Sequence, residues 1–294
     1  MTTYSEKKSS GRRCRVADLC ITAVMLVLLA VYFIPCLHIA AISFSSSRAI
    51  MNDRVSLWPV DFTLDAYRQI FAYPTFLSSY QNTIIHTVCG TLISLVMTIL
   101  FAYPLSKSFL RGQKTLMRLV VFTMFFSGGL IPNYLLVASL GLTGTRFGIL
   151  IPFAISPFYL IILISFFRTI PVELEEAARI DGYGWFGILL HIVLPLSAAA
   201  IATIGLYTAV FFWNDWFYSL IYLKDTQYPA MLVLRNIVSG SSMAGQAGGV
   251  GANASLAIAV KSAVIIITTI PPILIYPFLQ KNFVKGMTIG AVKG

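Results

Sequence analysis

The sequence has few charged residues. Only 11% of its 294 residues are Asp, Glu, Lys or Arg, whereas 57% are hydrophobic, and the mean hydropathy is +0.82. Soluble domains carry about a quarter charged residues. A chain this poor in charge cannot cover its own surface with solvated groups. We therefore exclude a soluble globular protein and infer that lipid surrounds most of the chain.

Cysteine and histidine are also scarce. The four cysteines show no C-x-x-C spacing and mostly lie in or beside apolar segments, and the three histidines are isolated from one another. Free cysteines in such surroundings act as small hydrophobic groups. The pattern therefore indicates neither a disulfide framework nor a metal site.

The sequence lacks the G-x-x-x-x-G-K-[ST] loop that binds nucleotide phosphates. Its nearest approach, Gly112-Gln113-Lys114-Thr115, has no glycine directly before the lysine. The chain also shows no nucleophile–base spacing of the kind used in catalysis. We expect that it is not an enzyme and does not itself hydrolyse ATP.

Long apolar segments dominate the chain instead. A helix of about twenty apolar residues crosses the roughly 30 Å of membrane hydrocarbon. Six candidates occur, at about 19–42, 82–105, 119–140, 147–167, 188–212 and 255–279. The third contains Gly128-Gly129 and Pro132, so we expect it to be broken. The sequence thus predicts an all-α polytopic membrane protein with six transmembrane helices.

The basic residues, which give a net charge of +10, are unevenly placed. They cluster before the first apolar segment, at 107–118 between the second and third, and after the last. Cytoplasmic loops are enriched in Lys and Arg. We therefore predict that both termini and the 107–118 loop are cytoplasmic, and that the charge does not serve nucleic-acid binding.

An acidic loop at 168–187 separates the fourth and fifth apolar segments. Pro171 suits the first turn of a helix, and acidic side chains just after it face the positive end of the helix dipole. Glu175 and Arg179 have the i,i+4 spacing of a weak ion pair. Gly182 suits the helix end because glycine adopts a left-handed conformation easily.

One face of this predicted helix combines Leu174, Ala177, Ala178 and Asp181 at helical spacing. Two alanines allow a partner backbone to come close. A helix of about ten residues is marginal in water by itself. Periodicity alone leaves two interpretations open: a solvated amphipathic connector, or a helix that docks against a partner.

A motif in this loop favours docking. Glu-Ala-Ala, three residues, Gly, nine residues and then I-x-L-P is matched at every defining position, by Glu176, Ala177, Ala178, Gly182, Ile192, Leu194 and Pro195. The loop resembles the EAA loop of ABC import permeases, by which a membrane subunit grips its ATPase.

Further stretches extend the resemblance over about 80–294. They are Asn82-Thr83, AYPLSK from Ala102, Pro132-Asn133-Tyr134, Trp213-Asn214 and the ending YPFLQKNFVKGMTIGAVKG. They are similar to the second permease subunit of maltose-type carbohydrate importers, and most of all to the subgroup serving alginate or pectin oligosaccharides. The resemblance implies the type I ABC importer permease fold.

The resemblance also assigns residues to partners. A coupling helix would contact the ATPase through Glu175, Glu176, Ala177, Ala178, Asp181 and Gly182. The tail would approach the ATPase dimer through Gly286, Met287, Thr288 and Gly290. The small-residue stretch 239–254, which we expect to be a flexible outer loop, resembles the loop that probes the binding protein's sugar cleft.

A substrate path is predicted near the outer membrane boundary. Sugars bind by aromatic stacking and amide hydrogen bonds, which the chain offers at Asn133, Tyr134, Trp213 and Asn214. Asp215 either joins them or reaches the membrane interface, because ionisable groups near a membrane seek a partner or water.

The predicted partners are a second, related permease subunit in a heterodimer, an ATPase dimer that holds ATP and Mg, an extracytoplasmic solute-binding protein and membrane lipid. The chain itself is expected to bind no cofactor and to lie in a bacterial cytoplasmic membrane. We predict a tail at 1–16, a first crossing with an outer segment at 17–79, a permease core at 80–279 and a tail at 280–294.

Two other classes stay open. A permease for amino acids or peptides would share the EAA loop, and only the flanking sequences and the tail favour sugar. An ion-coupled secondary transporter would need acids or histidines along its crossings, and the sequence has almost none there.

Overall fold

The computed structural model describes residues 10–246 and 252–291, with the backbone alone at 10–17, 238, 241–246, 252–254 and 275–291. Within these residues every regular element is a helix, so the all-α prediction is confirmed. The chain divides into two compact units. One contains the residues up to Ala72 and Val238–Ile267; the other contains Tyr73–Ile237 and the residues from Thr268 on.

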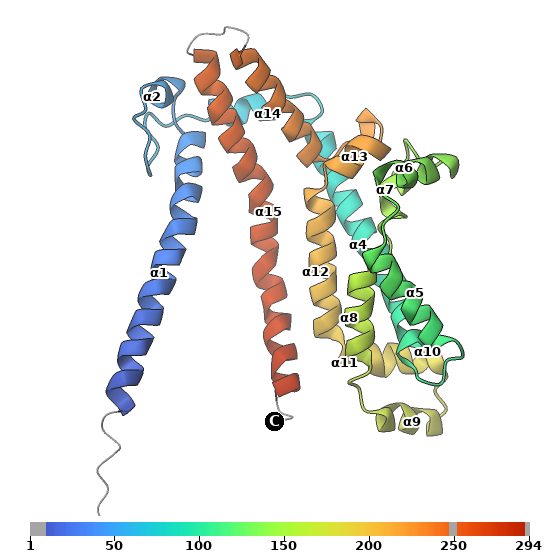
Figure 1. Cartoon of the computed structure of the whole chain (residues 1–294). Helices are drawn as coiled ribbons and strands as arrows, with labels where there is room; N and C mark the ends of the chain where they lie inside the picture. The colour runs from blue at the N-terminus through green and yellow to red at the C-terminus, as the bar shows by residue number, and fades with distance from the viewer. Residues whose placement is uncertain (1–9, 247–251, 292–294) are drawn as a thin grey trace, which may run out of the picture. The chain divides into compact units, whose positions relative to one another are not determined.

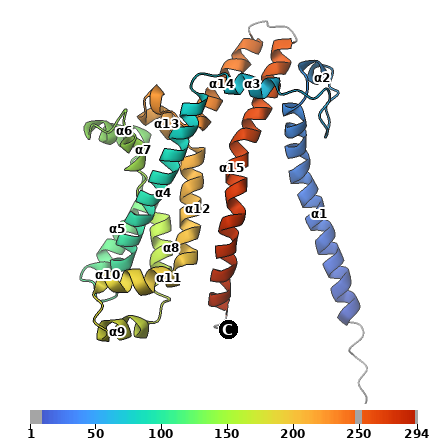
Figure 2. The same cartoon turned by 180° about the vertical axis from the view of Figure 1, so that it is seen from behind.

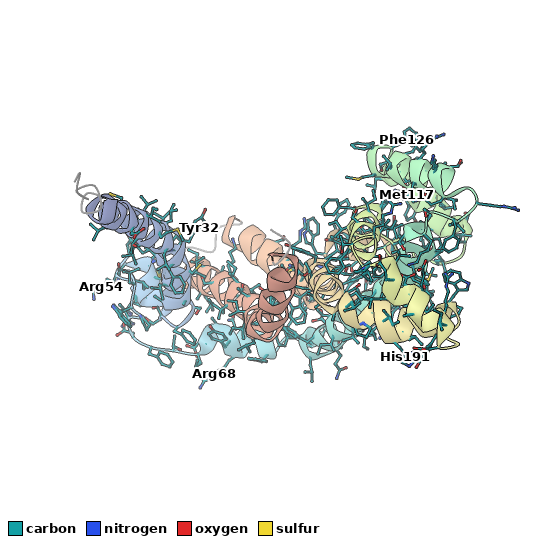
Figure 3. All side chains as sticks on the ribbon, turned by 90° about the horizontal axis from the view of Figure 1, so that it is seen from below. Tyr32, Arg54, Arg68, Met117, Phe126 and His191 are labelled. Carbon is teal, nitrogen blue, oxygen red and sulfur yellow. The ribbon has the colours of Figure 1, made fainter. Side chains whose placement is uncertain are left out.

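The first unit contains α1 (Ser10–Ser43), which includes the predicted first crossing. Apolar side chains point outward along α1, as the labelled Tyr32 does in Figure 3. Two short helices follow, α2 (Ser47–Met51) and α3 (Asp65–Phe71). Because α1 buries almost nothing within its own unit, its surface is suited to lipid or to another chain.

The second unit is organised around α4 (Phe76–Ser106), which packs along α12 (Ala198–Asn214) and α8 (Pro157–Phe167) (Figures 1 and 2). At 1.5 Å per residue, α4 is about 46 Å long. Its contact with α12 is tight, because a Cβ atom at Gly90 would lie 2.5 Å from the Phe212 ring. Only glycine allows this approach.

The two ends of α4 carry different elements (Figure 1). The helix α9 (Val172–Ile180) lies at the end where α4 finishes, and α13 (Phe217–Tyr222) lies near the end where it begins. We refer to them as the α9 end and the α13 end. The main hydrophobic core is at the α9 end and includes Ala102, Leu105, Leu160, Leu163, Ile164, Phe167, Ala178, Ile188, Leu189 and Val193.

The third apolar segment is broken, as predicted. It forms α5 (Gln113–Phe125) and α6 (Leu130–Ser139), and the chain bends by 117° between them. Gly129 at the break has φ +86°, a left-handed conformation that favours glycine. None of the side chains of α5 is buried, and the labelled Phe126 just beyond it points outward in Figure 3.

The fourth apolar segment differs from its prediction. We expected one bent helix over 147–167, but a single turn, α7 (Phe147–Leu150), is followed by irregular chain until α8 begins at Pro157. Ser156 has extended φ and ψ of −94° and 120°. The residue before a proline avoids the helical region, so the helix can start only at Pro157.

The prediction that the fifth segment is one crossing over 188–212 is wrong for the first third of that range. The chain forms α10 (Trp185–Ile188), a π-helical turn η1 (Leu189–Val193) and α11 (Leu194–Leu196), and then turns by 80° into α12. Pro195 lacks an N–H and its ring clashes with the preceding turn, which disturbs the helix at this point.

The predicted outer loop at 239–254 is also largely wrong. After η2 (Asp225–Gln227), α14 (Ala230–Gln246) continues through the small residues, and α15 (Ala252–Ala291) starts before the predicted last crossing. Only 247–251 of the loop lie outside the described residues. A helix that has already formed extends at low cost, even through glycine at about 1 kcal/mol each.

Three helices of the described chain are long and apolar enough to cross a membrane unbroken: α1, α4 and α15. The number rises to six if each of three bent pairs counts as one crossing. Two of these pairs, α5 with α6 and the helices from Trp185 to Leu196 with α12, correspond to the predicted third and fifth crossings. The remaining pair joins α8 to Val172–Ile180, the predicted coupling helix, so the fourth predicted crossing corresponds to α8 alone.

Candidate functional site

Helix α9 forms the centre of the predicted coupling loop. Pro171 precedes it with φ −57° and ψ 131°, and the helix begins one residue later, at Val172. Glu173 and Glu175 lie in its first turn, where the helix dipole favours negative charge. The sequence thus predicted the start of this helix to within a residue.

The other end of α9 is closed by a Schellman motif. Gly182 has φ +89°; its N–H donates to the Arg179 carbonyl at 3.0 Å, and the Tyr183 N–H donates to the Ala178 carbonyl at 2.9 Å. These two bonds satisfy carbonyls that a helix end otherwise leaves free. The prediction that Gly182 stops the helix is confirmed.

The buried face of α9 differs from the predicted contact face. Glu175 and Ala178 are buried, at 5% and 3% exposure, and Ala178 belongs to the hydrophobic core of the unit. Ala177 is exposed. The two alanines of the motif therefore point in different directions, and Ala178 packs against its own chain, unlike the predicted contact with a partner.

Glu175 forms a buried ion pair with Lys107, the residue directly after α4. The Lys107 ammonium also lies 4.7 Å from the centre of the Tyr103 ring, a cation–π contact. The predicted Glu175–Arg179 pair is wrong. An i,i+4 spacing places two groups near each other, but here a charge from another helix lies closer to Glu175.

Arg179 stacks on aromatic rings instead. Its guanidinium carbon lies 3.8 Å from the centre of the Trp185 ring and 5.9 Å from that of Phe109. A planar guanidinium stacks well on such rings. The sequence reasoning missed Lys107, Phe109 and Trp185. Their aromatic and basic character at the borders of apolar segments was the available signal, but it did not indicate which loop they contact.

The last turn of α4 is tied to its neighbours by further bonds. The Leu105 carbonyl accepts hydrogen bonds from Gln113 Nε2 at 3.0 Å and from an Arg168 guanidinium nitrogen at 3.3 Å. Beside these contacts lies a cavity of about 600 Å³, lined on the α9 side by Glu175, Glu176 and Arg179. The contacts between α9 and the end of α4 therefore lie at the edge of this cavity.

The outward face of α9 is free in the described chain. Glu173, Glu176, Ala177 and Ile180 are exposed, and Ile180 exposes 87% of its surface. At 100° per residue, Glu173 and Ile180 lie opposite the buried pair Glu175 and Ala178, and Glu176 lies between that face and the cavity beside α4. Asp181 and Gly182 are exposed as well. This face offers acidic groups and a large apolar side chain to a partner.

The I-x-L-P part of the motif lies in the π-helical turn and α11. Ile192 and Leu194 are half-buried and pack against the hydrophobic core, whereas Pro195 is exposed at the bend. The labelled His191 points away from the bundle in Figure 3. This part of the motif therefore anchors the loop and sets its direction.

The predicted tail contacts lie outside the residues whose side chains the structure describes. Gly286, Met287, Thr288 and Gly290 belong to the helical backbone of α15.

The substrate-path residues fall into two groups with different neighbours. Trp213 Nε1 donates to the Thr268 carbonyl of α15 at 3.2 Å, and its ring meets Tyr80 edge-on at 6.3 Å. Asn214 is exposed. Trp213 thus packs between α4 and α15 rather than beside Asn133 and Tyr134.

Asp215 is buried and caps α13. Its carboxylate accepts hydrogen bonds from the Tyr218 and Ser219 N–H groups at 3.1 and 2.9 Å, and from the Ser219 hydroxyl at 2.6 Å. Burial raises the pKa of the Asp215 carboxyl, while these three bonds lower it. These contacts within the chain account for the buried position of Asp215 without a bound substrate.

Asn133 lines a second cavity, of about 480 Å³, together with Tyr218 and Tyr222. The Tyr134 ring stacks on Tyr222 with 6.3 Å between centroids and 10° between planes. This site combines an amide with several aromatic rings, which is the chemistry expected for sugar. Among the described residues, no group of His, Cys, Asp and Glu could hold a metal ion.

No family model matches the chain. Protein LplC of Bacillus subtilis (strain 168) is 44% identical over 282 residues, covering 95% of this chain and 96% of LplC. The polygalacturonan/rhamnogalacturonan transport system permease protein YtcP of the same organism is 43% identical over 283 residues, covering 95% and 99%.

A solved structure has the same fold. The crystal structure of a bacterial ABC transporter involved in the import of the acidic polysaccharide alginate aligns with a TM-score of 0.83 and 33% identity, covering 96% of this chain and 100% of that one. Sequence and fold thus agree over nearly the whole length. The chain belongs to the permease subunits of carbohydrate ABC importers, and is a membrane-embedded component of a transporter.

Proposed function

We propose that this permease forms the membrane path of an importer for oligosaccharides derived from acidic polysaccharides. Two similar proteins support this proposal: YtcP is named as a polygalacturonan/rhamnogalacturonan transport permease, and the transporter of similar structure is described as importing the acidic polysaccharide alginate. The aromatic cavity that Asn133 lines supplies amide and ring surfaces for a sugar. Residues 80–279 would form the permease core.

The energy source in this proposal is a separate ATPase dimer, which holds ATP and Mg. The observation that carries it is the outward face of α9, where Glu176 and the largely exposed Ile180 have no cover in the described chain. An exposed apolar patch larger than one side chain marks an interaction site, and Val172, which is 58% exposed, lies on the same face of α9 as Ile180. Glu176 would meet a basic group of the ATPase.

The complex would contain a second, related permease subunit as a heterodimer partner and an extracytoplasmic binding protein that delivers the sugar. Both termini and α9 would face the cytoplasm of a bacterium, in agreement with the basic residues at 107–118. ATP binding would close the ATPase dimer, α9 would follow, and the cavity between the two permease subunits would open to the other side of the membrane.

The test of ATPase docking is the variant Glu176→Lys combined with Gly182→Pro. It reverses the exposed charge and removes the left-handed helix end. We expect loss of ATPase co-purification and of galacturonate-oligosaccharide uptake in reconstituted vesicles. Asp65→Lys, which changes an exposed acid on α3, is the matched control and should leave both intact. Normal co-purification and uptake with the double variant would exclude α9 as the docking helix.

The test of the substrate path compares two sets of variants. Asn133→Ala with Tyr134→Ala changes the aromatic cavity, and Trp213→Ala with Asn214→Ala changes the contact near α15. Uptake and sugar-stimulated ATP hydrolysis are measured for both. If the sugar follows the aromatic cavity, the first set reduces both activities more strongly than the second. The reverse order would place the path next to Trp213.

A further inference from the structure

The contact between α9 and α4 depends on two charged side chains that are largely removed from water. The Lys107 and Glu175 side chains are 13% and 7% exposed, and they form an ion pair. Burial makes the attraction between such charges stronger than on the surface. It also makes either charge costly to leave alone. Two helices joined in this way are expected to move together.

The other contacts of α9 do not reach α4 in the same way. Ala178 contributes only a small apolar side chain to the core. Arg179 stacks on Phe109 and Trp185, which come from the loop after α4 and from α10. The Arg168 bond to the Leu105 carbonyl holds the turn before α9. Glu175 is therefore the charged side chain of α9 that is fixed to α4's own end.

The pair lies at the end of α4, so a displacement of the pair can be carried along the whole helix. The helix is unbroken from Phe76 to Ser106. At its α13 end, the Asn82 amide donates to the Thr226 and Tyr228 carbonyls at 3.0 and 3.3 Å, and the Thr83 hydroxyl accepts from the Ala230 N–H at 2.8 Å. A rigid helix fixed at both ends transmits a displacement from one end to the other.

We propose that the Lys107–Glu175 ion pair is the link through which movement of α9 is passed to α4 and along it to the segment before α14. Both are positioning residues, which contact neither sugar nor nucleotide. The proposal rests on the proposed function, because it assumes that an ATPase moves α9. The proposal gives two neighbouring acids different roles: Glu176 contacts the ATPase, and Glu175 holds α9 to its own chain.

The experiment is a charge-reversal cycle in the complete importer, with partner permease, ATPase and binding protein reconstituted in vesicles. Lys107→Glu, Glu175→Lys and the double variant are compared with the wild type. The readout is galacturonate oligosaccharide taken up per ATP hydrolysed, in complexes that have been shown to assemble. A purely structural role would reduce assembly, and with it uptake and hydrolysis in proportion, but would not change this ratio.

We expect each single reversal to lower uptake per ATP by about tenfold or more, because each places like charges together in a buried site. The double variant restores the opposite charges and should return to within a few-fold of the wild type. The proposal is overturned if either single variant keeps the wild-type ratio, or if the double variant is no better than the worse single one.

Should the single reversals fail to assemble, Lys107→Met with Glu175→Gln decides the question. Neutral groups of similar shape often replace a buried pair without loss of stability. We expect this variant to assemble but to keep a low uptake per ATP; a wild-type ratio would overturn the proposal.

The matched control is the exposed ion pair Asp65–Arg68 of α3, whose side chains are 62% and 78% exposed. Its charge swap, Asp65→Arg with Arg68→Asp, should leave the ratio unchanged, since surface pairs contribute little. Uptake by the wild-type complex tests the proposed function by itself. The reversal cycle tests the link by itself, so either can fail while the other holds.

Discussion

The two ends of α4 are fixed by different chemistry. At the α9 end, a charged side chain of one helix pairs with a charged side chain at the end of another, Lys107 with Glu175. At the α13 end, Asn82 donates to two backbone carbonyls and accepts a hydrogen bond from Arg146 at 3.0 Å. The ion pair requires a charged side chain on both sides, whereas Asn82 bonds mostly to backbone carbonyls, which every residue carries.

This difference bears on how each end can move. Hydrogen bonds to carbonyls are directional and weaken steeply when the angle changes. An attraction between charges tolerates reorientation, provided that the two groups stay together. The α13 end is therefore expected to hold a fixed geometry, and the α9 end to remain joined while its angle changes. The following four variants test this comparison in order of decreasing effect.

The largest loss of stability is expected for Glu175→Ala. It leaves the Lys107 ammonium buried without its partner, which costs about 3–5 kcal/mol. The measurement is the thermal unfolding midpoint of the purified permease in detergent. Glu173→Ala, on the exposed side of the same helix, is the control and should stay within about 0.5 kcal/mol of the wild type. Equal effects at the two positions would show that the ion pair stabilises nothing.

A smaller loss is expected at the other end, for Asn82→Leu. The substitution preserves approximate size but removes the donors to the Thr226 and Tyr228 carbonyls and the acceptor for Arg146. Leaving buried polar groups unsatisfied costs about 1–3 kcal/mol. The same unfolding measurement applies. A loss larger than that of Glu175→Ala would reverse the order of the two ends.

A loss of about 1 kcal/mol is expected for Gly182→Ala, because an L side chain is disfavoured at φ +89°. The effect should be local: faster hydrogen exchange at the end of α9, with little change elsewhere. Gly184→Ala is the matched control, since Gly184 has φ −76° and open space around it. If both alanines behaved alike, the Schellman motif would contribute no stability.

The smallest effect is expected for His86→Leu, one turn along α4 from Asn82. His86 is fully buried, and neither ring nitrogen has a partner in the described part of the chain. Replacing such a group by an apolar side chain is nearly neutral or stabilising, within about 1 kcal/mol. A loss as large as that of Asn82→Leu would mean that His86 is hydrogen-bonded in the membrane.

Much of the fold was accessible from the sequence. The length of the apolar segments predicted α1, α4 and α15, because each of these helices is apolar over a stretch long enough to cross a membrane. The break at Gly129 and the stop at Gly182 were also predicted, because both require a backbone conformation that glycine tolerates best. Each of these features depends on residues that are close together in the chain.

The wrong predictions for the fourth and fifth apolar segments have a common cause. The segments 147–167 and 188–212 are apolar throughout, so hydropathy alone favoured single crossings. Pro157 and Pro195 shorten and bend them. Apolarity shows that a segment avoids water, but it does not show where the segment turns. In the same way, the small residues up to Gln246 were compatible with a loop, but continue a helix that had already begun.

The EAA motif shows which features the sequence alone determines and which depend on the tertiary structure. The sequence by itself determined that a short acidic helix stands between two apolar segments, where it begins and where it ends, because caps and dipoles act within a few residues. It also identified the family, since the motif residues are a pattern along the chain.

Only the tertiary structure decided which residues of that helix face inward. Glu175 and Ala178 are buried, and Glu176 and Ala177 are exposed, because Lys107 lies 68 positions earlier in the chain and reaches Glu175 from the end of α4. A helix offers every direction around its axis. Which direction becomes the interior depends on the helices packed beside it, and their positions are set by contacts between distant parts of the chain.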